Sequence, residues 1–217
     1  MPLPKNNLLF GFEPKLTDEQ REYVDSIFDN QLTIVNAKSG TGKTTLAVAC
    51  AKLIGKPLIY VFSPVQEKAM GFRPGTQQAK EKEYLQPLVD ALLKINEVPA
   101  RVLFDEENVD ALKAGHVWVY PKSHIFARGT NIEDCTVIID ESQNYTKNEL
   151  KKLLTRIHDN CTVIMIGHDG QVDLDRPEKS GFTPYIEHFR NEPYCKILEL
   201  HVNFRGQLAQ HADNLTW

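Results

Sequence analysis

The chain has 217 residues, of which 41% are hydrophobic and 25% are charged, and this ordinary globular composition excludes a disordered chain, a collagen-like chain and a small disulfide scaffold. At about 150 residues per domain the length favours one domain, so we expect a single domain over residues 1–217 with an N-terminal extension at 1–15. The 25 lysines and arginines against 29 acids give a net charge of −4, so contact with nucleic acid would need a local basic patch.

Six short apolar runs rich in β-branched residues are predicted to be strands. Continuous apolar runs, rather than alternating ones, are typical of strands that are buried on both faces of a parallel sheet. The runs are LTIVNA (32–37), PLIYVFS (57–63), VWVY (117–120), TVIID (136–140), TVIMIG (162–167) and KILELHV (196–202).

Helical patterns lie between several of these runs. Gly55 and Pro57 end the first pattern, and Thr146-x-x-Glu149 is a capping box at the start of the last one. Strands that alternate with helices predict an α/β fold of three layers with a mostly parallel sheet. The predicted helices cover 44–54, 79–95 and 149–157.

One segment between a predicted strand and a predicted helix matches the phosphate-binding loop of NTPases, with alanine at the position of its first glycine. Gly40 and Gly42 let backbone N–H groups turn toward phosphate oxygens, and the helix N-terminus adds partial positive charge. Lys43 is expected to reach the β- and γ-phosphates, Thr44 to bind Mg²⁺ through its hydroxyl, and Thr45 to contact the α-phosphate. The alternative is an accidental glycine-rich turn. The segment reads Ala37-Lys38-Ser39-Gly40-Thr41-Gly42-Lys43-Thr44.

Two adjacent acids follow the strand at 136–140. Asp140 is expected to hold the Mg²⁺ shell, and Glu141 to polarise the water that attacks the γ-phosphate. The alternative is a polar turn that ends the strand. An adjacent pair of acids also argues against a kinase, which activates a substrate hydroxyl instead of water.

Three further polar residues are candidates for the nucleotide site, and each has a structural alternative. Gln20 lies in Thr17-x-x-Gln20, which can be a helix capping box, can read adenine edges, or can do both. Gln171 follows the strand at 162–167 and either contacts the γ-phosphate or belongs to a solvated turn. Arg205 either clamps the γ-phosphate as charge spreads in the transition state or is a surface arginine.

These elements, in this order, resemble the PhoH family of ATPases from about Leu16 to the end of the chain. They are also similar to the first motor domain of superfamily 1 helicases, in which an LxxNFR-type segment carries the γ-phosphate arginine. Leu200-x-x-Asn203-Phe204-Arg205 matches that segment. The stretches that carry the resemblance are AKSGTGKTTLA, SPVQEKAMGFRPG, YLQPLVDAL, IFARGTNIEDCTVIIDESQNYT, LTRI and IGHDGQVDL.

The resemblance implies a RecA-like P-loop NTPase core that binds ATP and Mg²⁺ and hydrolyses ATP, with a less direct link to RNA metabolism or unwinding. Lys43, Glu141, Gln171 and Arg205 are then the catalytic candidates. The small size and the lack of an attached nuclease domain are similar to versions encoded by bacteriophages.

Two departures from the family pattern affect the site. The family usually has Gly-Asp after the third core strand, whereas this chain has Gly167-His168 with the acid displaced to Asp169, which affects the γ-phosphate sensor. Ser63-Pro64 stands where an Arg-Pro pair is common, which removes a possible phosphate or nucleic-acid contact.

Few residues follow Arg205, so a second motor domain is not expected within this chain. The protein is then either a slow monomeric nucleotide switch or a ring, most simply a hexamer, in which a neighbouring subunit completes the site. Arg128 and Arg156 are the candidates for an arginine that acts in trans, and each is equally suited to a structural role.

Local basic and aromatic residues are candidates for contact with single-stranded nucleic acid, and the family resemblance favours RNA over DNA. A solvated helix face explains the basic stripe equally well, and a subunit contact explains the loop at 71–78 equally well. The stripe contains Lys147, Lys151, Lys152 and Arg156, and the loop region contains Phe72, Arg73, Lys80 and Lys82.

Two other classes of function remain open. A non-catalytic module that assembles under the control of ATP fits the unusual Gly167-His168 step, and a small-molecule or nucleoside kinase would use the same phosphate loop.

The four cysteines lack C-x-x-C spacing, and no run is long enough to span a membrane or act as a signal peptide, so we expect buried thiols and a cytoplasmic protein. The seven histidines are scattered, so Mg²⁺ with the nucleotide is the metal we expect.

Overall fold

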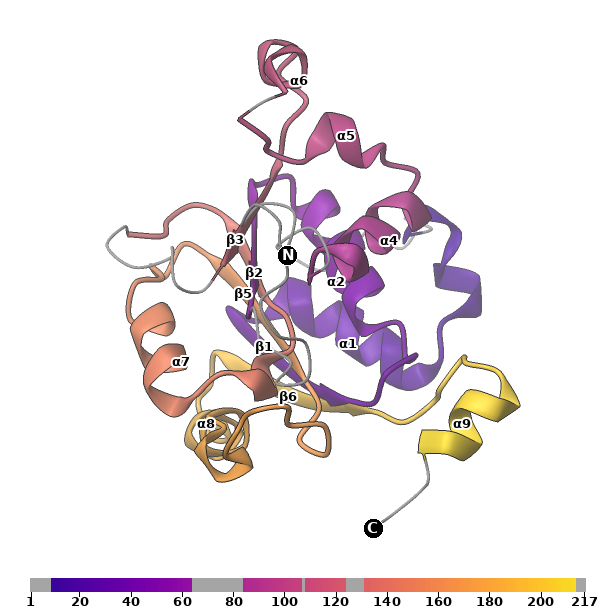
Figure 1. Ribbon diagram of the computed structural model, residues 1–217, viewed down its shortest axis with the longest axis vertical. Coiled ribbons are helices and arrows are strands. Elements are labelled where there is room, and N and C mark those ends of the chain that lie inside the picture. The colour runs from indigo at the N-terminus through magenta and orange to yellow at the C-terminus, as the bar shows by residue number, and fades with distance from the viewer. Residues whose placement is uncertain (1–8, 64–83, 107, 124–130, 214–217) are drawn as a thin grey trace.

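Six parallel strands form one sheet in the computed structural model, which describes residues 9–63, 84–106, 108–123 and 131–213 (Figure 1). The order across the sheet is β3-β2-β4-β5-β1-β6, and each neighbouring pair is parallel. All six predicted strands are therefore confirmed. The strands are β1 (Leu32–Ala37), β2 (Leu58–Phe62), β3 (Val119–Ser123), β4 (Thr136–Ile139), β5 (Thr162–Gly167) and β6 (Cys195–Leu200).

Helices cover both faces of the sheet, which gives the predicted three-layer α/β architecture. The helices α1, α2 and α4 pack on one face, and α7 and α8 pack on the other. None of the helices within the described ranges has the length and apolarity needed to cross a bilayer. The α-helices are α1 (Asp18–Asp29), α2 (Lys43–Ile54), α4 (Gln86–Lys94), α5 (Pro99–Val102), α6 (Val109–Lys113), α7 (Lys147–Leu154), α8 (Phe182–Phe189) and α9 (Gln207–Asp213). Short 3₁₀ turns are η1 (Leu9–Gly11), η2 (Glu13–Lys15), η3 (Ser142–Asn144) and η4 (Pro177–Lys179).

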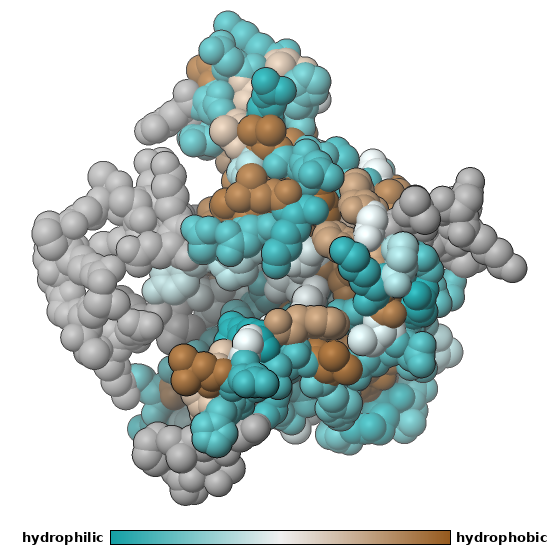
Figure 2. All heavy atoms as spheres, turned by 90° about the vertical axis from the view of Figure 1, so that its right-hand side faces the viewer, coloured by the Kyte–Doolittle hydropathy of each residue, from teal (hydrophilic) through white to brown (hydrophobic). Residues whose placement is uncertain are grey.

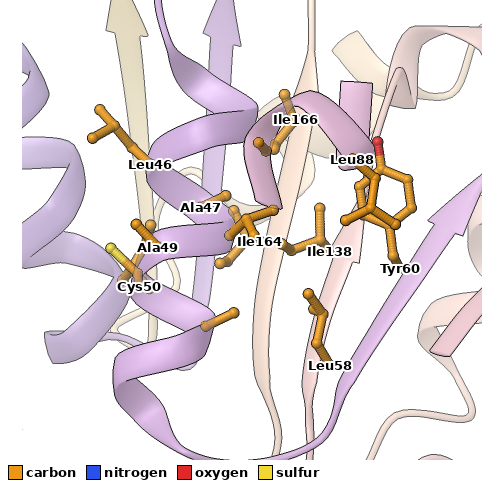
Figure 3. Packing of buried hydrophobic residues seen from close by; sticks show 14 of the residues in the cluster. Leu46, Ala47, Ala49, Cys50, Leu58, Tyr60, Leu88, Ile138, Ile164 and Ile166 are labelled. Carbon is orange, nitrogen blue, oxygen red and sulfur yellow. The ribbon is translucent and has the colours of Figure 1, made fainter. Parts of the chain in front are cut away.

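The helix that follows the phosphate loop is buried almost all round. Small residues let α2 approach the sheet closely, and Ala47, Ala49 and Ala51 have no exposed surface. Figure 3 shows this helix against side chains of β2, β4 and β5, including Tyr60 and Ile164. Because α2 is held this firmly, its N-terminus has a fixed position at the edge of the sheet.

A second core lies on the opposite face and joins α7 and α8 to the strands. Phe182 of α8 lies directly over Gly167 at the end of β5, where a Cβ atom would come within 2.7 Å of its ring. Gly181 lies close to the start of α7 in the same way, because a Cβ atom added there would come within 2.8 Å of Lys147 Cα. These close approaches fix the last residue of β5 and the first residue of α7, which lie on either side of the acidic pair.

The boundaries of three predicted elements differ most from the observed ones. The last predicted helix, at 149–157, is α7 and ends at Leu154, because the chain there turns so that Ile157 can bridge to Ile132. Arg156 therefore lies in the turn after the helix, and the predicted basic stripe along one helix was wrong at that residue. The second predicted helix, at 79–95, corresponds to α4 where the structure describes it, and the strand predicted at 117–120 is β3, which runs on to Ser123.

The outer surface is mostly hydrophilic on the side that carries α1 and α9, with small separate hydrophobic patches (Figure 2).

The sequence assigned residues 9–15 to an N-terminal extension. They include Leu9, whose side chain is fully buried in the core beside α1 and α2.

Candidate active site

Four strands deliver their last residues to one edge of the sheet because all of them run in the same direction. The phosphate loop follows β1, the acidic pair follows β4, the Gly-His step follows β5, and the Asn-Phe-Arg segment follows β6. Ligands of open α/β sheets bind at this edge, outside the carboxyl ends of the strands. The sheet topology therefore gathers the predicted site residues from segments far apart in the sequence.

The phosphate loop has the backbone that its glycines predict. Gly40 and Gly42 have φ angles of +86° and +82°, which side chains with a Cβ atom rarely adopt. The Nζ atom of Lys43 and the Oγ1 atom of Thr41 both donate to the Lys38 carbonyl, at 3.3 and 3.1 Å. Ala37 ends β1, while Lys43, Thr44 and Thr45 begin α2. The buried lysine is thus folded over a closed loop, with its ammonium beside the backbone that would surround a phosphate.

The first turn of α1 holds this loop from outside. The capping box is confirmed, because Gln20 N donates to Thr17 Oγ1 and Thr17 N donates to Gln20 Oε1, at 3.3 and 3.1 Å. The other amide atom, Gln20 Nε2, donates to the Thr41 carbonyl at 2.8 Å. With both amide atoms engaged and 5% of its surface exposed, Gln20 acts here as a brace for the loop. Its role in reading adenine stays a prediction.

A carboxylate meets the start of α2. Asp140 Oδ2 accepts from Thr44 Oγ1 at 3.3 Å and from the Tyr60 hydroxyl, and Oδ1 accepts from Glu141 N at 3.0 Å. Asp140 is 2% exposed, and its pKa is raised, first by burial and then by the neighbouring charge of Glu141. The hydrogen bond from Tyr60, the charge of Lys43 and the Glu141 N–H group oppose that rise. The site therefore holds a buried carboxylate that a cation would stabilise.

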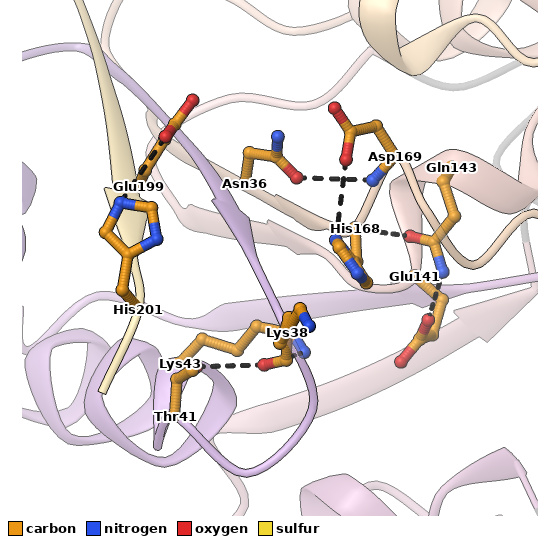
Figure 4. A network of polar contacts seen from close by, with 10 residues as sticks. All are labelled: Asn36, Lys38, Thr41, Lys43, Glu141, Gln143, His168, Asp169, Glu199 and His201. Carbon is orange, nitrogen blue, oxygen red and sulfur yellow. Dashed lines mark hydrogen bonds and ion pairs between the residues drawn. The ribbon is translucent and has the colours of Figure 1, made fainter. Parts of the chain in front are cut away.

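Glu141 has an unusual backbone and an anchored side chain. Its φ angle is +49°, a conformation uncommon outside glycine and typical of strained functional positions. Gln143 Nε2 donates to a Glu141 carboxylate oxygen, and Gln143 Oε1 accepts from His168 N at 3.0 Å (Figure 4). One buried amide thus ties the end of β4 to the end of β5 and holds the Glu141 carboxylate at the exposed surface of the site.

The step after β5 is tied to β1. Asp169 N donates to Asn36 Oδ1 at 3.2 Å, and Asp169 Oδ1 lies 3.5 Å from His168 Nδ1 (Figure 4). The displaced acid is therefore beside the histidine that stands at the usual acid position. Gln171 is exposed in the following turn, where its N–H group donates to the His168 carbonyl at 3.1 Å.

The segment after β6 lies on the phosphate loop. Phe204 N donates to the Gly40 carbonyl at 3.0 Å, and Arg205 Nη2 donates to Ser39 Oγ at 2.7 Å. A Cβ atom at Gly40 would come within 2.5 Å of Asn203 Oδ1 and 2.6 Å of Arg205 Cγ. The structure thus brings this guanidinium to the loop, from 166 positions away in the sequence.

Of the two arginines proposed to act in trans, one lies within the described residues and one lies outside them. Arg156 lies half-buried after α7, where its Nε atom donates to the Lys152 carbonyl at 3.1 Å. Arg128 lies outside the described residues, as does the segment at 71–82 with its aromatic and basic side chains.

Sequence reasoning missed the residues that orient the predicted ones. Tyr60 and Asn36 have no motif around them, because each acts on a group brought near by the fold. Gln143 had a signal, its place two residues after Glu141, but its partner His168 lies 25 positions away and no local pattern reveals it.

The family model of PhoH-like proteins matches residues 13–214. The chain belongs to the PhoH family. Curated relatives include protein PhoH2 of Bacillus subtilis, which is 30% identical over 95% of this chain and 48% of its own length. Protein PhoH of Escherichia coli is 32% identical over 83% of this chain and 51% of its own length. The chain thus spans about half the length of the relatives it matches.

The fold resembles those of several proteins of known structure. The large terminase of a thermophilic bacteriophage has a TM-score of 0.50 and 10% identity, covering 95% of this chain and 48% of the terminase. Pif1 of a Bacteroides species, solved in complex with ADP-AlF4, has a TM-score of 0.44 and 18% identity over 91% of this chain and 44% of Pif1. The chain is therefore a PhoH-family protein with a three-layer α/β core of the RecA-like P-loop type.

Proposed function

We propose that this PhoH-family chain is an ATPase that hydrolyses ATP with Mg²⁺. The observation that carries the proposal is the meeting of two motifs at one edge of the sheet: Thr44 Oγ1 lies 3.3 Å from Asp140 Oδ2, with Lys43 before the one and Glu141 after the other. A phosphate loop alone fits many NTP-binding proteins, whereas an adjacent second acid supplies a base for water.

The oxygen atoms present fit a magnesium ion. Thr44 contributes a hydroxyl and Asp140 a carboxylate, which are the hard oxygen ligands that Mg²⁺ takes beside phosphates. The raised pKa of Asp140 marks a buried negative charge that a divalent cation would stabilise. An ion held by Thr44 and Asp140 would neutralise part of the negative charge on the phosphates.

Each catalytic candidate then has a task in hydrolysis. Glu141 accepts a proton from the water that attacks the γ-phosphorus, the bond from that phosphorus to the bridging oxygen breaks, and ADP leaves. Lys43 and Arg205 stabilise the negative charge that spreads over the γ-phosphate. Gln143 keeps the Glu141 carboxylate oriented, and Gln171 contacts the γ-phosphate from the turn after β5.

We further propose that single-stranded nucleic acid, RNA rather than DNA, regulates hydrolysis. Lys147, Lys151 and Lys152 are exposed on α7, the helix that follows the acidic pair after one 3₁₀ turn, and they supply local positive charge in a chain with net charge −4. A head-to-tail ring, most simply of six copies, would let Arg128 or Arg156 of one copy reach the nucleotide of the next.

The test is phosphate release from ATP with Mg²⁺, with and without single-stranded RNA or DNA. Glu141→Gln keeps the shape of the side chain and removes the base, so kcat should fall by about 10²- to 10⁴-fold while ATP binding, measured by calorimetry, is retained. Stimulation by RNA but not DNA supports the regulatory proposal. ATP binding with no turnover above that of Glu141→Gln contradicts hydrolysis and favours an assembly module controlled by ATP, whereas transfer of phosphate to an acceptor other than water indicates a kinase.

A further inference from the structure

Glu19 makes contacts that the phosphate-loop motifs do not explain. It lies in the first turn of α1, and its carboxylate accepts three hydrogen bonds from backbone N–H groups just beyond β6. Its two oxygens accept from His201 N at 3.1 and 3.0 Å, and Oε1 also accepts from Val202 N at 2.7 Å. Hydrogen bonds to an ionised acceptor are about twice as strong as neutral ones, so this is a firm attachment for an exposed segment.

The attached segment is the one that carries Arg205. The His201 ring lies against Glu199, so Glu19 holds the backbone there rather than the ring (Figure 4). Three positions further on, Phe204 N donates to the Gly40 carbonyl at 3.0 Å, and Arg205 Nη2 donates to Ser39 Oγ at 2.7 Å. The segment is therefore held at its near end by α1 and at its far end by the phosphate loop.

The first turn of α1 contacts both the phosphate loop and the segment after β6, and so sets the spacing between them. Glu19 binds the backbone that leads to Arg205, while the next residue, Gln20, binds the Thr41 carbonyl in the phosphate loop at 2.8 Å. The contact between segment and loop is tight, because a Cβ atom at Gly40 would meet Asn203 Oδ1 at 2.5 Å. A shift of the backbone at 201–202 would therefore move the guanidinium relative to the loop.

We propose that Glu19 is a positioning residue that fixes Arg205 beside the phosphate loop. This inference rests on the proposed function, in which Arg205 stabilises charge on the γ-phosphate. An acid in the first turn of a helix also interacts favourably with the helix dipole, which is a purely structural role. The two roles differ in one respect: only the positioning role disappears when Arg205 is absent.

The test compares Glu19→Gln with a matched control on the same helix. Glu22 also reaches β6, through an ion pair with Lys196 at 2.8 Å, and this partner lies outside the segment at 201–205. Glu19→Gln should lower kcat for ATP hydrolysis about tenfold, equivalent to ~1.4 kcal/mol, with KM unchanged, while Glu22→Gln leaves both unchanged. In an Arg205→Ala background, Glu19→Gln should cause no further loss of kcat.

Hydrogen exchange gives a second readout that does not require hydrolysis. The amides of His201 and Val202 should exchange at least tenfold faster in Glu19→Gln than in Glu22→Gln or the unmodified protein. Unchanged exchange at these amides overturns the proposal whether or not the protein hydrolyses ATP. An equal loss of kcat with and without Arg205 also overturns it, because Glu19 would then act on the fold alone. Absence of turnover in the unmodified protein contradicts the proposed function but leaves the exchange result to decide the anchor.

Discussion

The phosphate loop and the acidic corner, which we define as Asp140, Glu141 and Gln143, face each other but are built differently. In the loop, positive φ angles fall on glycines, and the buried Lys43 donates to a nearby carbonyl. In the acidic corner, a positive φ angle falls on Glu141, and Asp140 is a buried acid with a raised pKa. The loop is therefore a relaxed structure, whereas the corner holds strain and charge that the rest of the fold must stabilise.

The largest effect expected from this difference concerns Asp140→Asn. The substitution should lower kcat by about 10³-fold, because the proposed magnesium ion would lose an anionic ligand. It should also raise the free energy of unfolding of the nucleotide-free protein at pH 7. Asparagine can keep the existing contacts, since its oxygen accepts from Glu141 N and its NH₂ group can donate to the hydroxyls of Tyr60 and Thr44. Phosphate release and chemical denaturation measure the two changes.

The stability gain should depend on pH in a defined direction. The pKa of Asp140 is higher in the folded than in the unfolded protein, so its ionisation disfavours folding at neutral pH. That cost disappears as the pH falls through the raised pKa and below the ordinary value, so the gain from Asp140→Asn should shrink in acid. Asp159→Asn, in the exposed turn before β5, is the control and should give no gain at pH 7. If Asp140→Asn is less stable than the unmodified protein at pH 7, the ionised Asp140 does not lower the stability of the fold, and this interpretation of the acidic corner is wrong.

The next effect concerns the contact between the loop and the arginine segment. Gly40→Ala should lower the free energy of unfolding by about 3 kcal/mol, because a positive φ angle and a collision with Asn203 and Arg205 add together. Gly55→Ala is the matched control: its φ angle is +76°, but no atom lies within 4 Å of the added Cβ, so it should show only the backbone cost of ~1–2 kcal/mol. Equal losses in the two variants would mean that the segment at 203–205 does not rest on the loop in solution.

The smallest effect concerns the orientation of Glu141. Gln143→Leu removes the amide that joins Glu141 to His168 and should lower kcat about tenfold, or ~1.4 kcal/mol, without changing KM. Asn144→Leu, one residue on, breaks a comparable pair with Asp173 that does not involve Glu141, and it should lower stability but not kcat. Steady-state kinetics on both variants would separate orientation from folding, and equal kcat values in the two would argue against an orienting role.

The same contrast explains how much of the molecule could be predicted. The inner strands β1, β2, β4 and β5 were found because nearly continuous burial leaves continuous apolar runs. The capping boxes at Thr17 and Thr146 were found because both partners lie within one turn. The phosphate loop is equally local. Where an element depends on a distant partner, prediction failed, as at Arg156, where the bridge from Ile157 to Ile132 ends the helix early.

The candidate site follows the same rule. Lys43, Thr44 and Asp140 were recognised from short motifs, and their meeting follows from parallel strands that share an edge. The contact of Arg205 with Ser39 and the anchor at Glu19 were not derivable, because they join segments more than 160 positions apart. Contacts between two distant segments produce no periodic pattern in the sequence of either segment.

The position of β1 between β5 and β6 has a consequence for how the protein is made. Leu32 pairs with Val163 on one side and with Cys195 on the other. The strand β1 is therefore synthesised long before β5 and β6, the two strands with which it pairs. Such distant pairings fold slowly, and an unpaired strand edge is open to association until it is covered. A nascent chain that ends after β2 already contains the whole phosphate-loop sequence, but it lacks both neighbours of the strand that leads into the loop. We therefore expect the proposed nucleotide binding to be a late event in biogenesis, and retention of ATP by a ribosome-bound chain would report that the sheet has closed.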